Sequence, residues 1–326
     1  MAQLLFRDAL NQAMSEEMER DSRVYLVGEE VAQYDGAYKV SQGMLARFGE
    51  KRVIDTPIAE LGFVAVAVGS ALAGLRPIIE VMTYNFAILS LDAIINTAAK
   101  AHQMTAGQLS CPIVLRGATG AGGALAAQHS QSLESQYTHI PGLICVSPST
   151  PADAKGLLKS AIRDPNPVIF FEHEALYSAK GEVPDAEHLV PIGKGDIKRE
   201  GSDVTIIAWS RQMKQLIEHS DAWSEELGLD IELVDPRTLR PLDMDLILAS
   251  VKKTGRVVIV EEGFQFNHVG AEIAYRIQRD GFDLLDAPIE RVTNIDVPMP
   301  YSPALEKLVL PNADRIKAAI RAVCYK

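Results

Sequence analysis

The chain has 326 residues, of which 47% are hydrophobic and 23% charged, and its formal net charge is -11. This composition is typical of a globular protein, and the length favours two domains because single hydrophobic cores rarely grow beyond roughly 250 to 300 residues. The negative charge argues against a nucleic-acid or anionic-membrane partner, since both would repel this protein.

Three cysteines without CxxC spacing predict neither a disulfide framework nor a zinc site, so a reducing cytoplasm is expected. The N-terminal residues lack the basic and apolar regions of a secretory signal, and no export is expected. The longest nearly apolar stretch, residues 61–75, is shorter than the roughly 20 residues that a membrane span requires. Because it is rich in Gly and Ala, we predict a buried helix there and no membrane partner.

Short apolar runs alternate with helical patterns in the first half of the chain, which predicts a parallel sheet covered by helices on both faces. The strands expected there are residues 24–27, 78–82, 113–115, 143–146 and 168–171. A second series of runs predicts another domain of the same kind. Its expected strands are residues 204–209, 231–234, 257–260 and 289–292, with a helix at 212–227.

The sequence therefore predicts an α/β protein built from two three-layer, doubly wound domains. Residues 178–203 are rich in Gly, Pro and charge and lack a strong period, which is typical of a connection between domains. We expect a first domain at residues 1–180, a linker at 181–202 and a second domain at 203–326.

Several common catalytic motifs are absent. The first expected strand is followed by Val27-Gly28-Glu29-Glu30 and not by GxGxxG, and no GKS or GKT sequence supports a phosphate-binding P-loop. No GxSxG elbow or HExxH sequence is present, which argues against a hydrolase and against a protein-bound catalytic metal.

The carboxylate of Glu60 has two possible interpretations. Glu60 follows a short expected strand and begins the apolar helical run, where a charge is costly to bury. It is either a helix N-terminal acid favoured by the dipole or a carboxyl group tuned by desolvation for acid–base work. The pattern alone leaves these two interpretations balanced.

Segments along essentially the whole chain resemble, in order, the beta subunits of the pyruvate dehydrogenase first component. The segments are GEEVAQYDGAYKVS at 28–41, DTPIAE at 55–60, GLRPI at 74–78, AAQHSQ at 126–131, AKGLL at 154–158, SAIRD at 160–164 and DVPMPY at 296–301. The resemblance implies a thiamine pyrimidine-binding domain followed by a transketolase-type C-terminal domain. It also implies thiamine diphosphate as the cofactor.

The same resemblance implies partners. In this family an alpha chain carries the diphosphate-binding domain, whose GDG signature is absent here, so magnesium would be held mainly by that alpha subunit. The expected assembly is an alpha2beta2 heterotetramer that docks a dihydrolipoyl acetyltransferase core with its lipoyl and subunit-binding domains. The chain is then active only with its alpha subunit.

By resemblance, Glu60 is the catalytic carboxylate that bonds the aminopyrimidine N1′ of the cofactor. Phe86 matches a position that packs on the aminopyrimidine, and Leu89 stands where the family often has Gln, which leaves packing alone. His129 matches a histidine near the reactive end of the cofactor, where it would assist the substrate or the lipoyl transfer. Glu29 matches an acid in a polar tunnel between paired active sites.

A monovalent cation site, expected to hold potassium on backbone oxygens, is implied near four residues. They are Ile113, Ala161, Asp164 and Asn166. Arg76, before Pro77, is interpreted as a solvated or ion-paired side chain outside the site.

Pyruvate is the substrate that the resemblance favours, because residues 34–38 and 126–129 look more pyruvate-type than branched-chain-type. Acetoin and branched-chain 2-oxo acid dehydrogenase beta subunits remain alternatives. A different class of hypothesis is a non-catalytic module that assembles or anchors an alpha subunit, and the presence of Glu60 disfavours it.

Overall fold

A computed structural model describes residues 1–326. They form two compact units, one comprising Met1–Thr119 and Gln136–Ile192 and the other Gly120–Ser135 and Gly193–Lys326. Each unit has a mainly parallel sheet between helices, which confirms the predicted α/β fold class. None of the helices is both long enough and apolar enough to cross a membrane.

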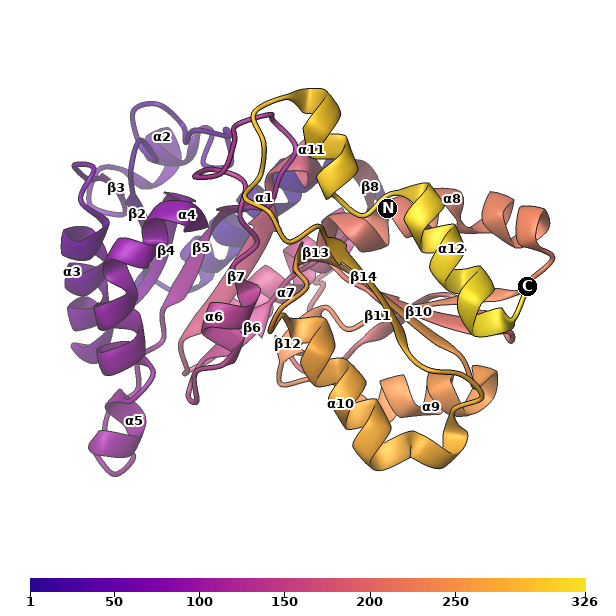
Figure 1. Cartoon of the computed structure of the whole chain (residues 1–326). Helices are drawn as coiled ribbons and strands as arrows, with labels where there is room; N and C mark the ends of the chain where they lie inside the picture. The colour runs from indigo at the N-terminus through magenta and orange to yellow at the C-terminus, as the bar shows by residue number, and fades with distance from the viewer. The chain divides into compact units, whose positions relative to one another are not determined.

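In the first unit the parallel strands lie in the order β6-β7-β5-β4-β2-β3 (Figure 1). The strand order reverses at β2, whose neighbours are β3 and β4, and ligands usually bind beyond the carboxyl ends of the strands at such a point. The bounds of these strands are β2 Val24–Gly28, β3 Val53–Asp55, β4 Arg76–Thr83, β5 Val114–Thr119, β6 Ile144–Val146 and β7 Val168–His173. A small antiparallel pair, β1 Ala2–Leu5 with β8 Lys180–Val183, was not predicted.

Helices cover this sheet in layers. The long helices α1 (Phe6–Arg20) and α7 (Pro151–Arg163) pack against each other, while α3 (Glu60–Leu72) packs on β4 and on the π-helical turn η2 (Ala93–Ala98). Shorter elements of the unit are α2 Met44–Phe48, α4 Tyr84–Ala87, η1 Ile88–Ser90, α5 Ala101–Met104 and η3 Glu174–Leu176. The short helix α6 Glu134–Thr138 begins with two residues of the second unit and continues in the first.

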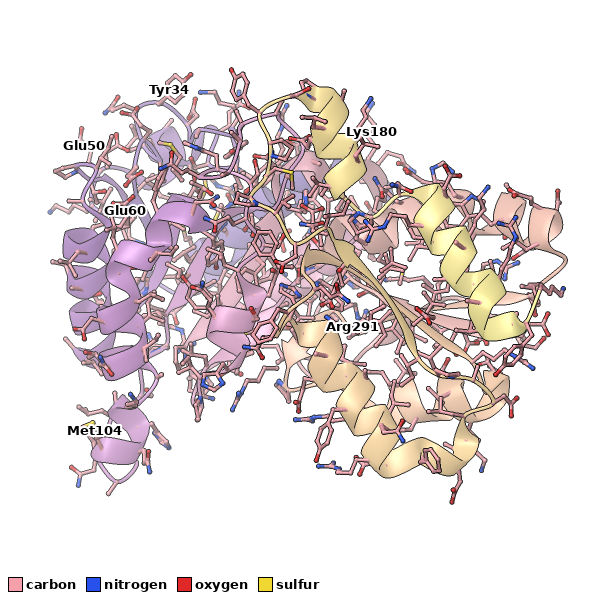
Figure 2. The ribbon with its side chains drawn as sticks, in the orientation of Figure 1. Tyr34, Glu50, Glu60, Met104, Lys180 and Arg291 are labelled. Atoms are coloured by element: carbon pink, nitrogen blue, oxygen red, sulfur yellow. The ribbon has the colours of Figure 1, made fainter.

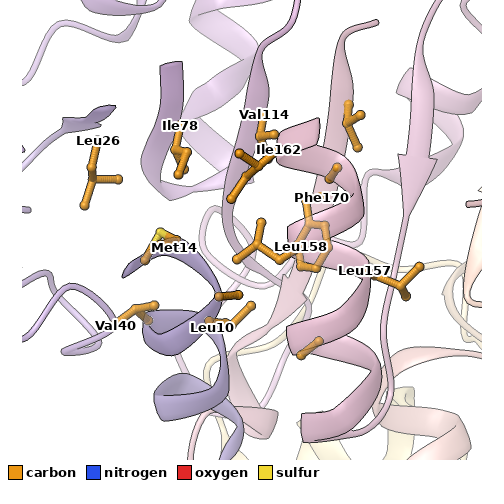
Figure 3. Packing of buried hydrophobic residues seen from close by; sticks show 14 of the residues in the cluster. Leu10, Met14, Leu26, Val40, Ile78, Val114, Leu157, Leu158, Ile162 and Phe170 are labelled. Atoms are coloured by element: carbon orange, nitrogen blue, oxygen red, sulfur yellow. The ribbon is translucent and has the colours of Figure 1, made fainter. Parts of the chain in front are cut away.

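The core of this unit lies between the α1/α7 pair and the sheet. Figure 3 shows Leu10 and Met14 of α1 and Leu158 of α7 among the strand residues Ile78 and Phe170, all fully buried. Burial of each such side chain stabilises the fold by roughly 1.5 to 3 kcal/mol relative to exposure, so this cluster fixes the sheet whose strand ends carry the candidate site.

The helix predicted at residues 61–75 forms as α3, but the prediction that it is buried was wrong for one face. Phe63 and Val64 are buried, whereas Leu61 is 57% exposed and Val66 is 72% exposed. The helix is apolar on all sides, and only one side can pack on the sheet and η2. The other side is an apolar surface in this chain.

The second unit has the strand order β14-β13-β10-β11-β9, parallel except for the antiparallel edge strand β9. Helices α8 and α12 lie on one face of this sheet and α9 and α10 on the other (Figure 1). Its strands are β9 Asp196–Arg199, β10 Val204–Ala208, β11 Ile231–Asp235, β12 Thr238–Arg240, β13 Val257–Phe264 and β14 Glu290–Asn294. Its helices are α8 Ser210–Leu227, α9 Met244–Thr254, α10 Val269–Gly281, η4 Phe282–Leu284, α11 Pro303–Val309 and α12 Ala313–Cys324.

Two segments differ from a simple division along the chain. Residues 181–202, the expected linker, contain most of β8 and all of β9. Strand β8 pairs with β1 in the first unit, and β9 pairs with β11 in the second. Residues 120–135 belong to the second unit although they precede the last strands of the first. Sequence position alone does not reveal such a crossing, because it depends on contacts between distant residues.

Candidate functional site

Glu60 is the first residue of α3 and is only 4% exposed (Figure 2). The turn that begins the helix is fixed by the Ala59 carbonyl, which accepts hydrogen bonds from Gly62 N and Phe63 N at 2.8 and 3.1 Å. The positive end of the helix dipole favours a negative charge at this position. Both sequence interpretations of Glu60 therefore have support, because the acid is at a helix N-terminus and is also buried.

The residues before Glu60 hold the loop that follows β2. The Asp55 carboxylate accepts hydrogen bonds from Ala32 N at 2.6 Å and Gln33 N at 3.0 Å. Thr56 N donates to the Gly28 carbonyl at 3.0 Å. The DTPIAE segment thus holds the loop after β2 at the carboxyl end of the sheet while it leads into the helix that carries Glu60.

Glu29 follows β2 and is 3% exposed. Its Oε1 atom is buried without a hydrogen-bond partner. Burial, the charge of Glu60 and a hydrogen bond to Glu60 together raise the pKa of the Glu29 carboxyl to about 7. The two predicted acids are therefore neighbours, and a negative charge on one disfavours a negative charge on the other. The pair can hold one proton near neutral pH.

The aromatic candidate lies at the end of the adjacent strand. Thr83 Oγ1 accepts hydrogen bonds from Asn85 N and Nδ2, which starts the short helix α4 that contains Phe86. Phe86 is half-buried, and Leu89 on η1 is 62% exposed. Because α3 packs against both α4 and η1, Phe86 and Leu89 lie on elements that contact the helix beginning at Glu60.

A close backbone approach brings β2 and β4 together at this site. A Cβ atom on Gly28 would lie 2.3 Å from the Glu80 carbonyl oxygen, so no side chain fits there. The carboxyl ends of both strands, followed by Glu29 and by Tyr84, are thereby held side by side.

His129 belongs to the second unit and is exposed on the loop of residues 120–135. Its backbone N–H donates to the Ala126 carbonyl at 3.3 Å, and Ala126 has a positive φ of 67°. The neighbouring Ser130 is buried. The His129 side chain is therefore exposed, although other residues of the same loop are buried.

The residues predicted for a monovalent cation lie just before β5 and at the C-terminal end of α7 in the first unit. The Ile113 carbonyl accepts a hydrogen bond from Val168 N at 2.9 Å, and the Ala161 carbonyl accepts one from Asp164 N at 3.3 Å. Asn166 donates through N and Nδ2 to Asp164 Oδ1 at 2.8 and 2.9 Å. Each of these carbonyls retains a second lone pair. No group of three or more His, Cys, Asp or Glu side chains suitable for a metal is present.

The interpretation of Arg76 as solvated or ion-paired was wrong. Its guanidinium donates to the Ile162 carbonyl at 2.7 and 3.0 Å and to the Asp164 carbonyl at 2.6 Å. Arg76 therefore satisfies carbonyls at the C-terminus of α7, where a positive charge also complements the helix dipole.

The buried Glu29 carboxyl makes stability depend on pH. Its pKa of about 7 in the folded chain exceeds the ordinary 4.5, so stability should fall as pH rises between these values. Glu29→Gln should match the wild type at pH 5 and be more stable at pH 8, by about 1 to 3 kcal/mol. Urea unfolding at both pH values measures this difference.

The exposed Glu50→Gln variant is the matched control for the same change of charge and should show no such dependence. Equal stability differences for Glu29→Gln at pH 5 and pH 8 would contradict the raised pKa.

Comparison with known proteins decides the family. A model of the transketolase pyrimidine-binding domain matches residues 2–180, and one of the transketolase C-terminal domain matches residues 193–316. The pyruvate dehydrogenase E1 component subunit beta of Rhizobium meliloti is 54% identical over 327 residues, covering 100% of this chain and 71% of that protein. This chain belongs to the family of pyruvate dehydrogenase E1 beta subunits. The family is transketolase-like and depends on thiamine diphosphate. Because pyruvate dehydrogenase is an oxidoreductase, the chain is a component of an oxidoreductase.

Other E1 beta relatives cover the chain equally well. The Rickettsia felis subunit is 52% identical over 323 residues, covering 99% of both chains. The mitochondrial subunit of Rattus norvegicus is 50% identical, covering 98% of this chain and 90% of that protein. A solved split-gene transketolase, described as an inactive beta4 tetramer, has a TM-score of 0.81 at 22% identity and covers 99% of this chain and 98% of that one. This last likeness confirms the two-domain transketolase-like fold.

Proposed function

We propose that this chain is the beta half of a pyruvate dehydrogenase first component, in which Glu60 activates thiamine diphosphate. The observation that carries the proposal is the buried carboxyl group of Glu60 at the head of α3, next to the protonatable Glu29. A carboxylate in such a place can bond a ring nitrogen and share its proton, which an exposed acid in water would do far less effectively.

The residues at this site fit the aminopyrimidine of the cofactor. Glu60 supplies a buried carboxylate, the orphaned Oε1 of Glu29 lacks a partner, and Phe86 offers a half-buried aromatic ring. When bound, thiamine diphosphate supplies the electron sink for decarboxylation of a 2-oxo acid. The role of Glu60 would be to hold a proton at the pyrimidine N1′, while Phe86 and Leu89 pack against the ring and exclude water.

A second chain would complete the site. Apolar side chains lie exposed beside Glu60, among them Ile58 at 78%, Leu61 at 57% and Leu89 at 62%. Exposed apolar patches of this kind commonly mark interfaces. We propose that an alpha subunit covers them in an alpha2beta2 heterotetramer and holds magnesium and the diphosphate, for which this sequence has no GDG.

Three further assignments belong to the same proposal. His129 would assist the substrate or transfer to a lipoyl group, since an imidazole can both donate and accept a proton. A potassium ion would use the free lone pairs of the Ile113 and Ala161 carbonyls together with Asp164 and Asn166. The C-terminal domain would dock the acetyltransferase core through its subunit-binding domain, and the complex would work in the cytoplasm.

The isolated chain should bind thiamine diphosphate and magnesium at least about 100-fold more weakly than the alpha/beta pair, because it lacks the diphosphate half of the site. Isothermal titration of the chain alone and of the reconstituted pair measures the difference. Tight, magnesium-dependent binding by the chain alone would refute the half-site model.

Carbon dioxide release by the reconstituted pair from pyruvate and from branched-chain 2-oxo acids, together with acetoin oxidation, would then identify the substrate. Activity with pyruvate well above the others supports the proposal. Preference for acetoin would instead assign the chain to an acetoin dehydrogenase. Assembly without any of these activities would favour the non-catalytic module.

A further inference from the structure

In the loop that carries His129, residues near the two ends are joined by a hydrogen bond. The start of this loop is also bonded to residues of the C-terminal part of the chain. Gly120 N donates to the Gln131 carbonyl at 3.0 Å, which joins the two ends of the turn. Ala121 N donates to Glu262 Oε1 of β13 at 2.6 Å, and the Ala121 carbonyl accepts a hydrogen bond from Arg211. These contacts all lie within the second unit.

A further contact holds the middle of the loop. Ala124 N donates at 3.1 Å to Glu306 Oε2 of α11, and Glu306 is buried. Ala124 has a positive φ of 53°, a conformation that a non-glycine residue rarely adopts without support. The first half of the loop is therefore fixed by two buried carboxylates before the chain reaches His129.

The far end of the loop is held by an ionic contact. Glu134, five residues after His129, is buried, and its Oε2 atom lies 3.5 Å from His268 Nε2. Neither of these two atoms makes a hydrogen bond, so the contact between them is an ion pair. His268 Nδ1 lies 2.6 Å from Glu261 Oε2. The imidazole thus bridges a carboxylate of the loop and a carboxylate of β13.

The ring of His268 packs against a tryptophan and against the backbone. Its ring stacks on Trp209, with ring centroids 6.4 Å apart and planes inclined by 6°. A Cβ atom on Gly263 would lie 2.4 Å from His268 Nε2, and one on Gly270 would lie 2.3 Å from Glu261 Oε1. Two glycines at these positions allow the His268 and Glu261 side chains to sit against the backbone.

Charges around His268 favour its protonated form. Burial lowers the pKa of the imidazole, but the carboxylates of Glu134 and Glu261 outweigh this and raise it to about 10. Arg291, labelled in Figure 2, donates to Glu261 and is the other cation of the cluster. The four groups form two acid–base pairs, so removal of one cation leaves a buried carboxylate unpaired.

We propose that His268 is a positioning residue for His129: through Glu134 it fixes the end of the loop from which His129 projects. The inference rests on the proposed role of His129 in the reaction. A catalytic group must be held to within a fraction of an ångström, and a displacement of about 1 Å can lower the rate roughly 100-fold. His268 has no contact with substrate in this role and acts only through the loop.

The test uses the alpha/beta holoenzyme with His268→Gln, which keeps a similar shape and removes the charge. Hydrogen exchange of peptides within residues 126–135 should become faster. The kcat for lipoyl-linked turnover should fall about 10-fold or more, while the KM for pyruvate changes little. Adding Glu134→Gln should restore part of the exchange protection, because the double variant has no unpaired carboxylate. His219→Gln is the matched control, since His219 also stacks on a tryptophan but is exposed.

A double-mutant cycle separates positioning from general stability. His129→Ala should lower activity by itself, and His268→Gln should then cost little more in that background. An equal loss in both backgrounds, or unchanged exchange of the loop in His268→Gln, would overturn the inference. A fully active His129→Ala enzyme would refute the role proposed for His129 and with it the catalytic part of the inference, while the exchange result would still decide whether His268 holds the loop.

Discussion

Glu60→Gln is expected to lower decarboxylation by the reconstituted alpha/beta pair by roughly 100-fold to 10,000-fold, the range that a positioned acid–base group usually contributes. The amide has nearly the shape of the carboxyl group but cannot exchange a proton with the cofactor ring. Steady-state release of carbon dioxide from pyruvate measures the loss. Size-exclusion chromatography should show that the pair still assembles.

Two further variants make this result specific. Glu60→Asp keeps the carboxylate but draws it back by one methylene group, so we expect activity between those of Glu60→Gln and the wild type. Glu50→Gln changes an exposed acid of the same unit and should leave turnover unchanged (Figure 2). Near-normal turnover by Glu60→Gln would contradict the assigned role.

Arg116→Met is expected to destabilise the first unit by about 3 to 5 kcal/mol, because it leaves two buried carboxylates without their cation. Arg116 on β5 is fully buried and donates to both oxygens of Glu172 on β7, at 2.6 and 2.5 Å, and also to Glu80 on β4. Tyr177 donates to Glu172 at 2.9 Å. The Arg116 side chain thus joins β4, β5 and β7, three adjacent strands of the sheet that carries the candidate site.

The destabilisation should depend on pH with a definite sign. Burial already raises the pKa of Glu80, the charge of Arg116 lowers it, and removal of Arg116 would let it rise further. A carboxyl group whose pKa is higher in the folded chain lowers the free energy of unfolding as pH rises. The variant should therefore be less stable at pH 8 than at pH 5.

The measurement should report on the first sheet itself. Both tryptophans, Trp209 and Trp223, lie in the second unit, so peptide-resolved hydrogen exchange of β4, β5 and β7 in increasing urea is the suitable probe. Arg23→Ala removes an exposed ion pair with Asp21 and should cost less than about 1 kcal/mol. A comparably small loss for Arg116→Met would show that the buried ions do not hold the strands.

Much of the fold could be predicted from patterns that are local. Every strand expected from an apolar run, such as residues 24–27 and 168–171, forms within a few residues of its predicted position. Buried parallel strands give such runs because both of their faces are covered. The pair β1 and β8 was missed because most of its residues are exposed or only partly buried, and because β8, Lys180–Val183, carries charge.

The candidate site could be predicted only in part. The motif of residues 55–60 indicated Glu60, yet the hydrogen bonds that Asp55 makes to the loop after β2 depend on pairing between β2 and β3. Arg116 did have a signal in the sequence, because a lone arginine within an apolar strand must be paired if it is buried. Its partners Glu80 and Glu172 could not be named, since they follow from the strand order.

The sequence by itself determined that Glu60 begins an apolar helix and that the chain resembles half of a thiamine enzyme. Those conclusions rest on neighbours along the chain and on motifs read in order. Only the tertiary structure decided that Glu29 is buried beside Glu60, that Arg76 caps a helix, and that His268 lies against Glu134 at the end of the loop of His129. These relations join residues far apart in the sequence, and their energies arise from burial and close contact between charges, which exist only once the strands and helices are packed.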